Sequence, residues 1–145
     1  MEVSDQLQEI LRIRNEVRRL NLAGADIVLI QPINLLAKIY NGTGPEFLPD
    51  KIRKLLDSIA RVSLPGVMVH DIRFEFSDGS KASFHQANVE LLVNCITCAL
   101  DAYKWYQIRL YSSLLKAVII YLACQKFGWI AWRSAYLKNQ TKETK

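Results

Sequence analysis

The sequence contains few cysteines: Cys95, Cys98 and Cys124 are the only three among 145 residues. Small extracellular domains are usually cross-linked by several disulfides, and a sparse, odd set cannot build such a framework. The count argues against a disulfide-rich secreted domain and predicts reduced thiols that pack as small apolar side chains. Cys95 and Cys98 have the spacing of a redox or metal motif, but they fall within a long helical pattern. We therefore favour a packing role for them over a redox or metal role.

Long uncharged apolar runs are also missing. The most hydrophobic stretch, residues 114–124, is interrupted by Lys116 and followed by Lys126. Its uncharged part is far shorter than the roughly 20 residues that span a bilayer, so we predict a central buried helix there and no transmembrane segment. The N-terminal residues are charged and show no apolar segment of the signal-peptide type, which predicts a cytoplasmic location.

What is present fits one globular domain. Hydrophobic residues make up 50% of the chain and charged residues 23%, which is ordinary for a folded protein and argues against disorder. A chain of 145 residues can bury a substantial core. The formal net charge of +5 favours acidic partners, either anionic lipid surfaces or nucleic acid, and charge alone does not choose between them. We predict a single domain over residues 1–145, without a linker or an internal repeat.

Apolar residues recur at helical spacing along most of the chain. The segment at 64–76 is predicted to begin a new helix with Pro65 in its first turn, where the missing amide proton costs least. The polar tail at 138–145 is predicted to be frayed. The predicted helices cover residues 1–24 (an outer N-terminal helix), 33–39, 50–60, 64–76, 83–103 and 111–137.

Three segments are less determined by their pattern. Residues 27–30 could form a short extended segment or one turn of helix. The turn signal at 77–80 permits a small β-hairpin over residues 73–82. The aromatic residues at 103–106, with basic neighbours, could stack on bases or lie at a lipid interface, but we favour a corner packed between two helices. The predicted fold class is therefore mainly α, a compact helical domain with a possible small β-hairpin.

Two short motifs concentrate the chemistry that the sequence can express. The first, residues 40–45, reads Tyr-Asn-Gly-Thr-Gly-Pro, and its glycines let backbone carbonyls turn to one side. The second, His70-Asp71, ends an apolar segment, where polar side chains need partners. A hard cation such as calcium takes carboxylate and carbonyl oxygens together, so Asp71 and the loop carbonyls would form a calcium site. His70 would then be free to act as a general base.

In this order the motifs resemble the calcium loop and the His-Asp helix of the phospholipase A2 superfamily, over residues 40–91. The resemblance implies paired central helices and a calcium ion that is bound by Asp71 and the loop. It also implies that His70 activates the water that attacks a lipid ester. The implied calcium ligands are the backbone carbonyls of Tyr40, Gly42 and Gly44 and the side chain of Asp71. The same motif order is similar to that of some uncharacterised bacterial and phage proteins, and this similarity implies no function.

Two supporting positions depart from the family pattern. Asn88 stands where relatives have an Asp that orients the histidine, and Phe74 stands where they often have Tyr. We expect the helices that carry His70 and Asn88 to cross, so that these two side chains meet. The implied function is calcium-dependent hydrolysis of a lipid carboxylic ester, with His70 and Asn88 as the catalytic residues. The alternative is a non-catalytic, membrane-associated or structural binding module that keeps the fold. We expect a phospholipid or membrane partner rather than nucleic acid, and the sequence predicts no oligomeric state.

Overall fold

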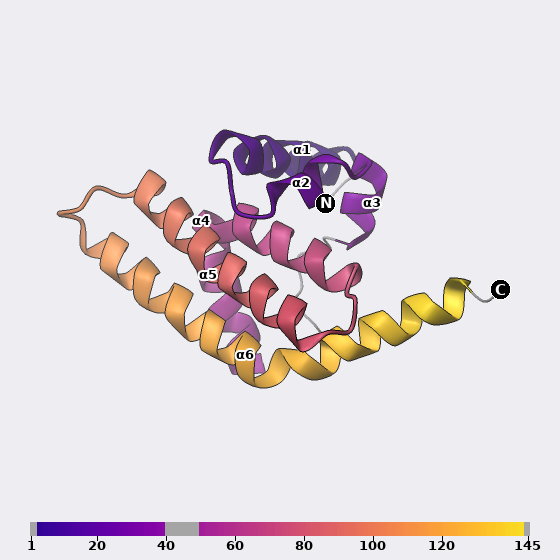
Figure 1. Cartoon of the computed structure of the whole chain (residues 1–145). Coiled ribbons are helices and arrows are strands. Elements are labelled where there is room, and N and C mark those ends of the chain that lie inside the picture. The colour runs from indigo at the N-terminus through magenta and orange to yellow at the C-terminus, as the bar shows by residue number, and fades with distance from the viewer. Residues whose placement is uncertain (1–2, 40–49, 144–145) are drawn as a thin grey trace.

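The computed structural model describes residues 3–39 and 50–143, and these residues form helices without any β-strand. Figure 1 shows the arrangement, which confirms the predicted mainly α class and contains no hairpin of strands within the described residues. The helices are α1 (Val3–Arg19), α2 (Ala25–Leu29), α3 (Ile33–Ile39), α4 (Asp50–Glu75), α5 (Lys81–Ala102) and α6 (Ile108–Glu143).

Helix α4 is the centre of the fold, because it packs against each of the other five described helices. On one side, α1, α2 and α3 lie together as a cap, and on the other side α5 and α6 form a long antiparallel helical hairpin (Figure 1). The pairing of α4 with α5 is the most extensive one in the described chain. The predicted pair of central helices is therefore α4 and α5.

The main core lies between the cap and the C-terminal half of α4. Helix α1 presents Ile10, Ile13 and Val17 at helical spacing, and all three are buried. They pack in one cluster with residues of α4 that include Met68 and Ile72, both fully buried. The N-terminal helix is shorter than predicted, since Arg19 ends it and the chain turns before α2 begins. Its apolar stripe makes it part of the core and not only an outer element.

The predicted break before residue 64 is wrong, because α4 runs without interruption from Asp50 to Glu75 with Pro65 inside it. A proline in a helix interior removes one hydrogen bond and costs about 3 kcal/mol. Pro65 is buried, and the next residue, Gly66, lies so close to α5 that an added Cβ would come within 2.9 Å of Asn94 Cβ. Tertiary packing around this turn holds the helix together despite the proline.

The predicted hairpin at 73–82 is also wrong, because its turn signal joins two helices. Ser80 is the N-cap of α5, and its hydroxyl oxygen accepts a hydrogen bond from the Ser83 amide at 3.1 Å. The Asp78 carboxylate accepts hydrogen bonds from the Ser80 amide at 2.9 Å and from the Ser83 hydroxyl at 2.6 Å. Gly79 adopts a φ of +74°, which suits glycine. These local contacts start α5 directly after the turn.

Residues 27–30, whose sequence permitted an extended segment or a turn of helix, are helical. They form the end of α2 and its C-cap.

Helix α6 is an outer helix and not the central buried helix that the sequence predicts for 114–124. Ala117 and Ile120 are buried against α5, whereas Leu115 and Leu122 are 63% and 57% exposed. The predicted packed corner is wrong too: Trp105 lies in the α5–α6 turn with 77% of its surface exposed. Because α4 occupies the centre of the fold, only one side of α6 packs against other helices.

The C-terminal residues that were predicted to fray are helical as far as Glu143. The Asn139 side chain donates a hydrogen bond to the Glu75 carbonyl, at the end of α4, at 2.6 Å. Gly128 lies within α6 and brings the helix close to an aromatic side chain, since an added Cβ would lie 3.2 Å from the Phe84 ring. Figure 1 shows the yellow end of α6 reaching past α4 and α5.

Candidate functional site

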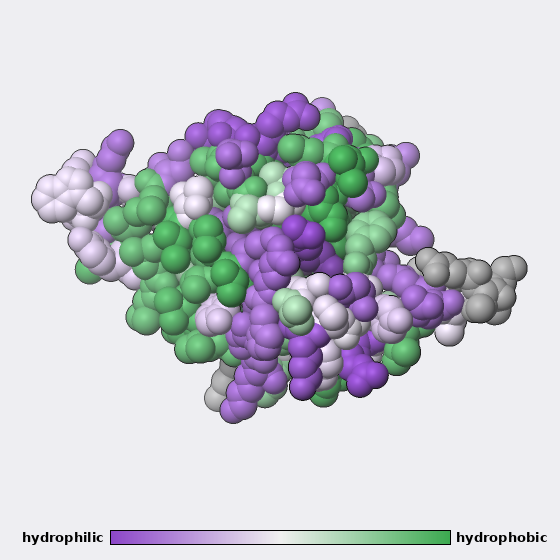
Figure 2. All heavy atoms as spheres, in the orientation of Figure 1, coloured by the Kyte–Doolittle hydropathy of each residue, from purple (hydrophilic) through white to green (hydrophobic). Residues whose placement is uncertain are grey.

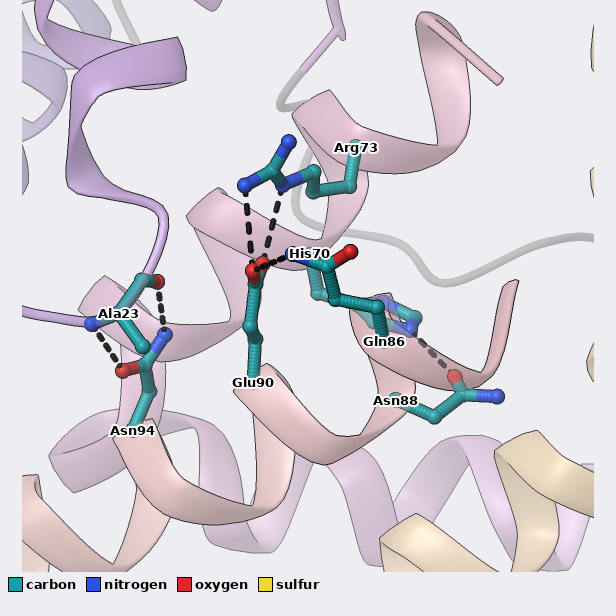
Figure 3. A network of polar contacts seen from close by, with 7 residues as sticks. All are labelled: Ala23, His70, Arg73, Gln86, Asn88, Glu90 and Asn94. Carbon is teal, nitrogen blue, oxygen red and sulfur yellow. Dashed lines mark hydrogen bonds and ion pairs between the residues drawn. The ribbon is translucent and has the colours of Figure 1, made fainter. Parts of the chain in front are cut away.

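His70 and Asn88 meet between α4 and α5, as the sequence predicts. His70 Nε2 lies 3.0 Å from Asn88 Oδ1 (Figure 3). His70 is 8% exposed and Asn88 is fully buried. Each residue belongs to the inner face of its helix, so the contact follows directly from the pairing of α4 with α5.

The contact indicates which ring nitrogen of His70 carries the hydrogen. An amide oxygen can only accept a hydrogen bond, so His70 Nε2 must carry its hydrogen and donate it to Asn88 Oδ1. In the neutral ring, the lone pair is then on Nδ1. His70 Nδ1 lies 3.9 Å from Asp71 Oδ1, which is beyond hydrogen-bond distance. The nitrogen that can accept a proton therefore faces the side of the ring where Asp71 lies.

An aromatic cluster covers another side of the His70 ring. The Phe74 ring centroid lies 4.3 Å from that of His70, and Trp132 of α6 packs edge-on against Phe74 at 5.0 Å. Phe84 and Ala87 complete the buried part of this cluster. Phe74 thus packs on the imidazole ring and cannot donate a hydrogen bond to it. Two buried nitrogens, Asn88 Nδ2 and Trp132 Nε1, have no hydrogen-bond partner among the described residues.

A second polar network holds α4 and α5 in register beside the His70 contact (Figure 3). Arg73 binds Glu90 through two hydrogen bonds, from Nε at 3.0 Å and from Nη2 at 3.1 Å. Gln86 also donates to Glu90, at 3.0 Å. Paired hydrogen bonds between a guanidinium and a carboxylate fix orientation as well as distance. The pair therefore positions the two helices on which His70 and Asn88 lie.

Asn94 ties the same face of α5 to the loop before α2. Its side chain donates to the Ala23 carbonyl at 2.9 Å and accepts from the Ala23 amide at 2.8 Å. Sequence reasoning missed this contact and the Arg73–Glu90 pair. The available signal was the position of Glu90 and Asn94 four residues apart on one side of the predicted helix, where buried polar groups need partners.

The predicted calcium ligands lie partly within the described residues. The loop residues Tyr40, Gly42 and Gly44 lie outside the described residues. Asp71 is described, and its side chain is 40% exposed, so its carboxylate oxygens can reach a cation from solvent. Within residues 3–39 and 50–143, no three or more His, Cys, Asp or Glu side chains gather into a metal-binding group. Asp71 fits the role of one oxygen ligand, and a calcium ion there would have to take its remaining ligands from elsewhere.

The cysteines and the second histidine take no part in this site. All three cysteines are free, and burial raises the pKa of Cys95 to about 11 and the pKa of Cys98 to about 12. Burial and the nearby Asp71 carboxylate raise the pKa of Cys124 to about 12. Thiols with such pKa values are poor nucleophiles at neutral pH. His85 is exposed, and its Nδ1 contacts Gln125 at 2.9 Å.

No protein-family model, no curated protein and no solved structure matches this chain. The resemblance to phospholipases A2 therefore depends on the two motifs alone.

Proposed function

We propose that this protein is a phospholipase A2-like, calcium-dependent hydrolase of a lipid carboxylic ester, with His70 as the general base. The observation that carries the proposal is the 3.0 Å contact between His70 Nε2 and Asn88 Oδ1. It holds the ring in one orientation and leaves the Nδ1 lone pair for a water molecule. Asp71, the neighbouring residue, supplies an accessible carboxylate for the cation.

In this proposal the chain's own residues divide the work. His70 Nδ1 takes a proton from the water that attacks the ester carbonyl, and Asn88 keeps the ring from rotating. The aromatic cluster around Phe74 keeps bulk water from one side of the imidazole. A calcium ion at Asp71, when bound, would stabilise the negative charge that develops on the ester oxygen.

Asn88 limits the rate that we expect. A neutral amide orients the imidazole but supplies no negative charge to stabilise the imidazolium that forms. In a serine protease triad, the change of the corresponding Asp to Asn lowers the rate by about 10⁴. We therefore expect slow turnover in the wild-type protein.

The second candidate is a membrane-associated binding module that keeps the fold without efficient chemistry. Two observations favour it: the neutral partner of His70 and the apolar side of α6, where Leu115 and Leu122 are exposed. A binding module needs the surface and not the base, so its function would not depend on His70.

Calcium should stabilise the wild-type protein against unfolding, and Asp71→Asn should abolish that effect while the protein still folds. A ligand that binds only the native state stabilises it by about 2.7 kcal/mol at a hundredfold excess over its dissociation constant. The measurement is the melting temperature with and without millimolar calcium. Asp26→Asn is the matched control, because Asp26 is an exposed aspartate on α2. If calcium leaves the wild-type melting temperature unchanged, the metal has no place in the proposal.

Asn88→Asp should raise calcium-dependent hydrolysis of phospholipid vesicles, and adding His70→Ala should remove the gain. The binding-module candidate predicts the opposite: a buried carboxylate near Asp71 adds repulsion and desolvation, so Asn88→Asp would lower the melting temperature without creating activity. Asn94→Asp is the matched control, because Asn94 is a buried asparagine of the same helix that contacts Ala23 and not His70. An absence of hydrolysis above background in every variant would reject the enzyme.

A further inference from the structure

Helix α6 is apolar on two opposite sides, and only one of them is covered. Ala117 and Ile120 pack against α5. On the other side, apolar residues follow one another at intervals of three and four positions, which places them on one stripe of the helix. This stripe consists of Leu115 (63% exposed), Val118 (42%), Ile119 (39%) and Leu122 (57%).

Helix α5 also exposes apolar side chains. Val93 and Leu100 are 46% and 58% exposed, and Figure 2 shows hydrophobic atoms gathered over α5 and the first half of α6. We name this surface the hairpin face, made of Val93, Leu100, Leu115, Val118, Ile119 and Leu122. Soluble monomers rarely expose large contiguous apolar surfaces unless these bind something. Helix α6 is also the one described helix that is long and apolar enough to cross a membrane, and only 11% of its most apolar window is buried.

The turn between α5 and α6 carries the side chains that are typical of a membrane interface. Trp105 and Tyr106 are 77% and 69% exposed, and their rings pack against each other at 5.8 Å. Amphipathic rings of this kind favour the headgroup region. Lys104 and Arg109 flank them and are exposed, so the turn offers positive charge to anionic headgroups.

We propose that the hairpin face binds an anionic phospholipid bilayer, with α5 and α6 lying parallel to the membrane surface. This holds whether or not His70 is catalytic, because it depends only on the surface of α5 and α6. A parallel orientation is favoured over insertion of the turn: Asp101, next to the turn, forms an ion pair with Arg19 of α1 at 2.6 Å. Insertion would carry that pair into the hydrocarbon, where charged side chains are expensive.

A second copy of the chain fits the hairpin face less well than a lipid surface does. Each copy has a net charge of +5, so two copies repel each other, whereas an anionic bilayer attracts the protein. The packed side of α6 also argues against a spanning helix, since α4 and α5 occupy it in place of lipid. At the membrane interface, the apolar stripe would contact lipid while the opposite side of α6 stays packed against α4 and α5.

Vesicle co-sedimentation tests the proposal, with vesicles of phosphatidylcholine alone and of equal parts phosphatidylcholine and phosphatidylglycerol. The test variant is Leu115→Glu with Leu122→Glu. The control is Leu11→Glu with Ile30→Glu, which places the same charge change on two exposed apolar residues of the cap, 45% and 75% exposed. All four positions are exposed, so melting curves should show that both variants fold like the wild type.

We expect the wild type and the control variant to bind the mixed vesicles. Binding should be at least tenfold weaker to phosphatidylcholine alone, and at least tenfold weaker for Leu115→Glu with Leu122→Glu. Equal binding by the test and control variants would overturn the proposal, and so would a wild type that stays in the supernatant. Sedimentation equilibrium without vesicles adds a further check: a dimer that the test variant dissociates, with no vesicle binding, would assign the face to a second copy.

Discussion

Helices α4 and α6 are the two longest in the described chain, with 26 and 36 residues, and their positions are opposite to what their sequences suggest. Helix α4 contains Pro65 and several charged residues, yet it lies at the centre and contacts every other described helix. Helix α6 includes the most hydrophobic stretch of the chain, yet it is an outer helix that packs mainly against two others, α4 and α5. Burial is therefore set by how many helices surround a helix, and a helix's own hydropathy does not determine it.

The same difference separates the two candidate functions in space. The central position of α4 buries His70 against Asn88, where a fixed tautomer and a low dielectric suit chemistry. The outer position of α6 leaves an apolar stripe facing solvent, where it can meet a membrane. The proposed membrane-binding surface and the proposed general base thus lie on neighbouring helices of one small domain.

The largest expected effect compares one truncation in each helix. Ile72 of α4 is fully buried, so Ile72→Ala should lower the free energy of unfolding by about 2–5 kcal/mol. Leu115 of α6 is 63% exposed, so Leu115→Ala should change it by no more than about 0.5 kcal/mol. Urea denaturation of both variants measures the difference. A comparable loss of unfolding free energy in both variants would mean that the outer side of α6 is buried in solution. It would reject the contrast between a central α4 and an outer α6.

A smaller effect on stability is expected when the glycine inside each of these helices, Gly66 in α4 and Gly128 in α6, is replaced by alanine. At Gly66 in α4, an added Cβ would lie 2.9 Å from Asn94 Cβ, and overpacking of this kind costs about 1–3 kcal/mol. At Gly128 in α6, the nearest atom would be a Phe84 ring carbon at 3.2 Å, a contact that a shift of a few tenths of an ångström would relieve. Alanine also gains roughly 1 kcal/mol of helix propensity at each site. Gly66→Ala should therefore destabilise the protein, whereas Gly128→Ala should be nearly neutral in thermal unfolding.

The smallest effect is expected at the turn that joins α4 to α5. Hydrogen bonds from the Ser83 hydroxyl and the Ser80 amide lower the pKa of Asp78. A lowered folded-state pKa stabilises the protein above the unfolded-state pKa of about 3.9, and this stabilisation is lost as pH falls through the lower folded value. Asp78 is exposed, so Asp78→Asn should cost less than about 1 kcal/mol at pH 7.

Unfolding of the wild type and Asp78→Asn from pH 7 down to pH 2 should show that small difference shrinking below about pH 4. Ser134→Ala, at an exposed position of α6, serves as the control for an unrelated polar substitution. A difference that grew on acidification would have the wrong sign and would reject this account of the turn.

Local chemistry in the sequence was enough to predict most of the helices. The spacing of Ile10, Ile13 and Val17 identified the buried face of α1, because helical periodicity is a property of neighbouring residues. The meeting of His70 with Asn88 was predictable for a related reason: both positions lie on apolar helix faces, and two such faces pack together. The calcium loop at Tyr40, Gly42 and Gly44 stays a prediction, as do the metal and the hydrolysis.

The tertiary structure decided what depends on contacts between distant residues. Whether Pro65 breaks a helix depended on the packing of Gly66 against α5. Whether residues 138–143 fray depended on contacts such as that of Asn139 with the end of α4. Which apolar helix is central depended on how many neighbours each one has, a quantity that no single segment of sequence contains. The sequence by itself determined most of the helices and the pair of side chains at the candidate site, and the packing of the whole chain decided that α6 keeps an apolar face toward solvent.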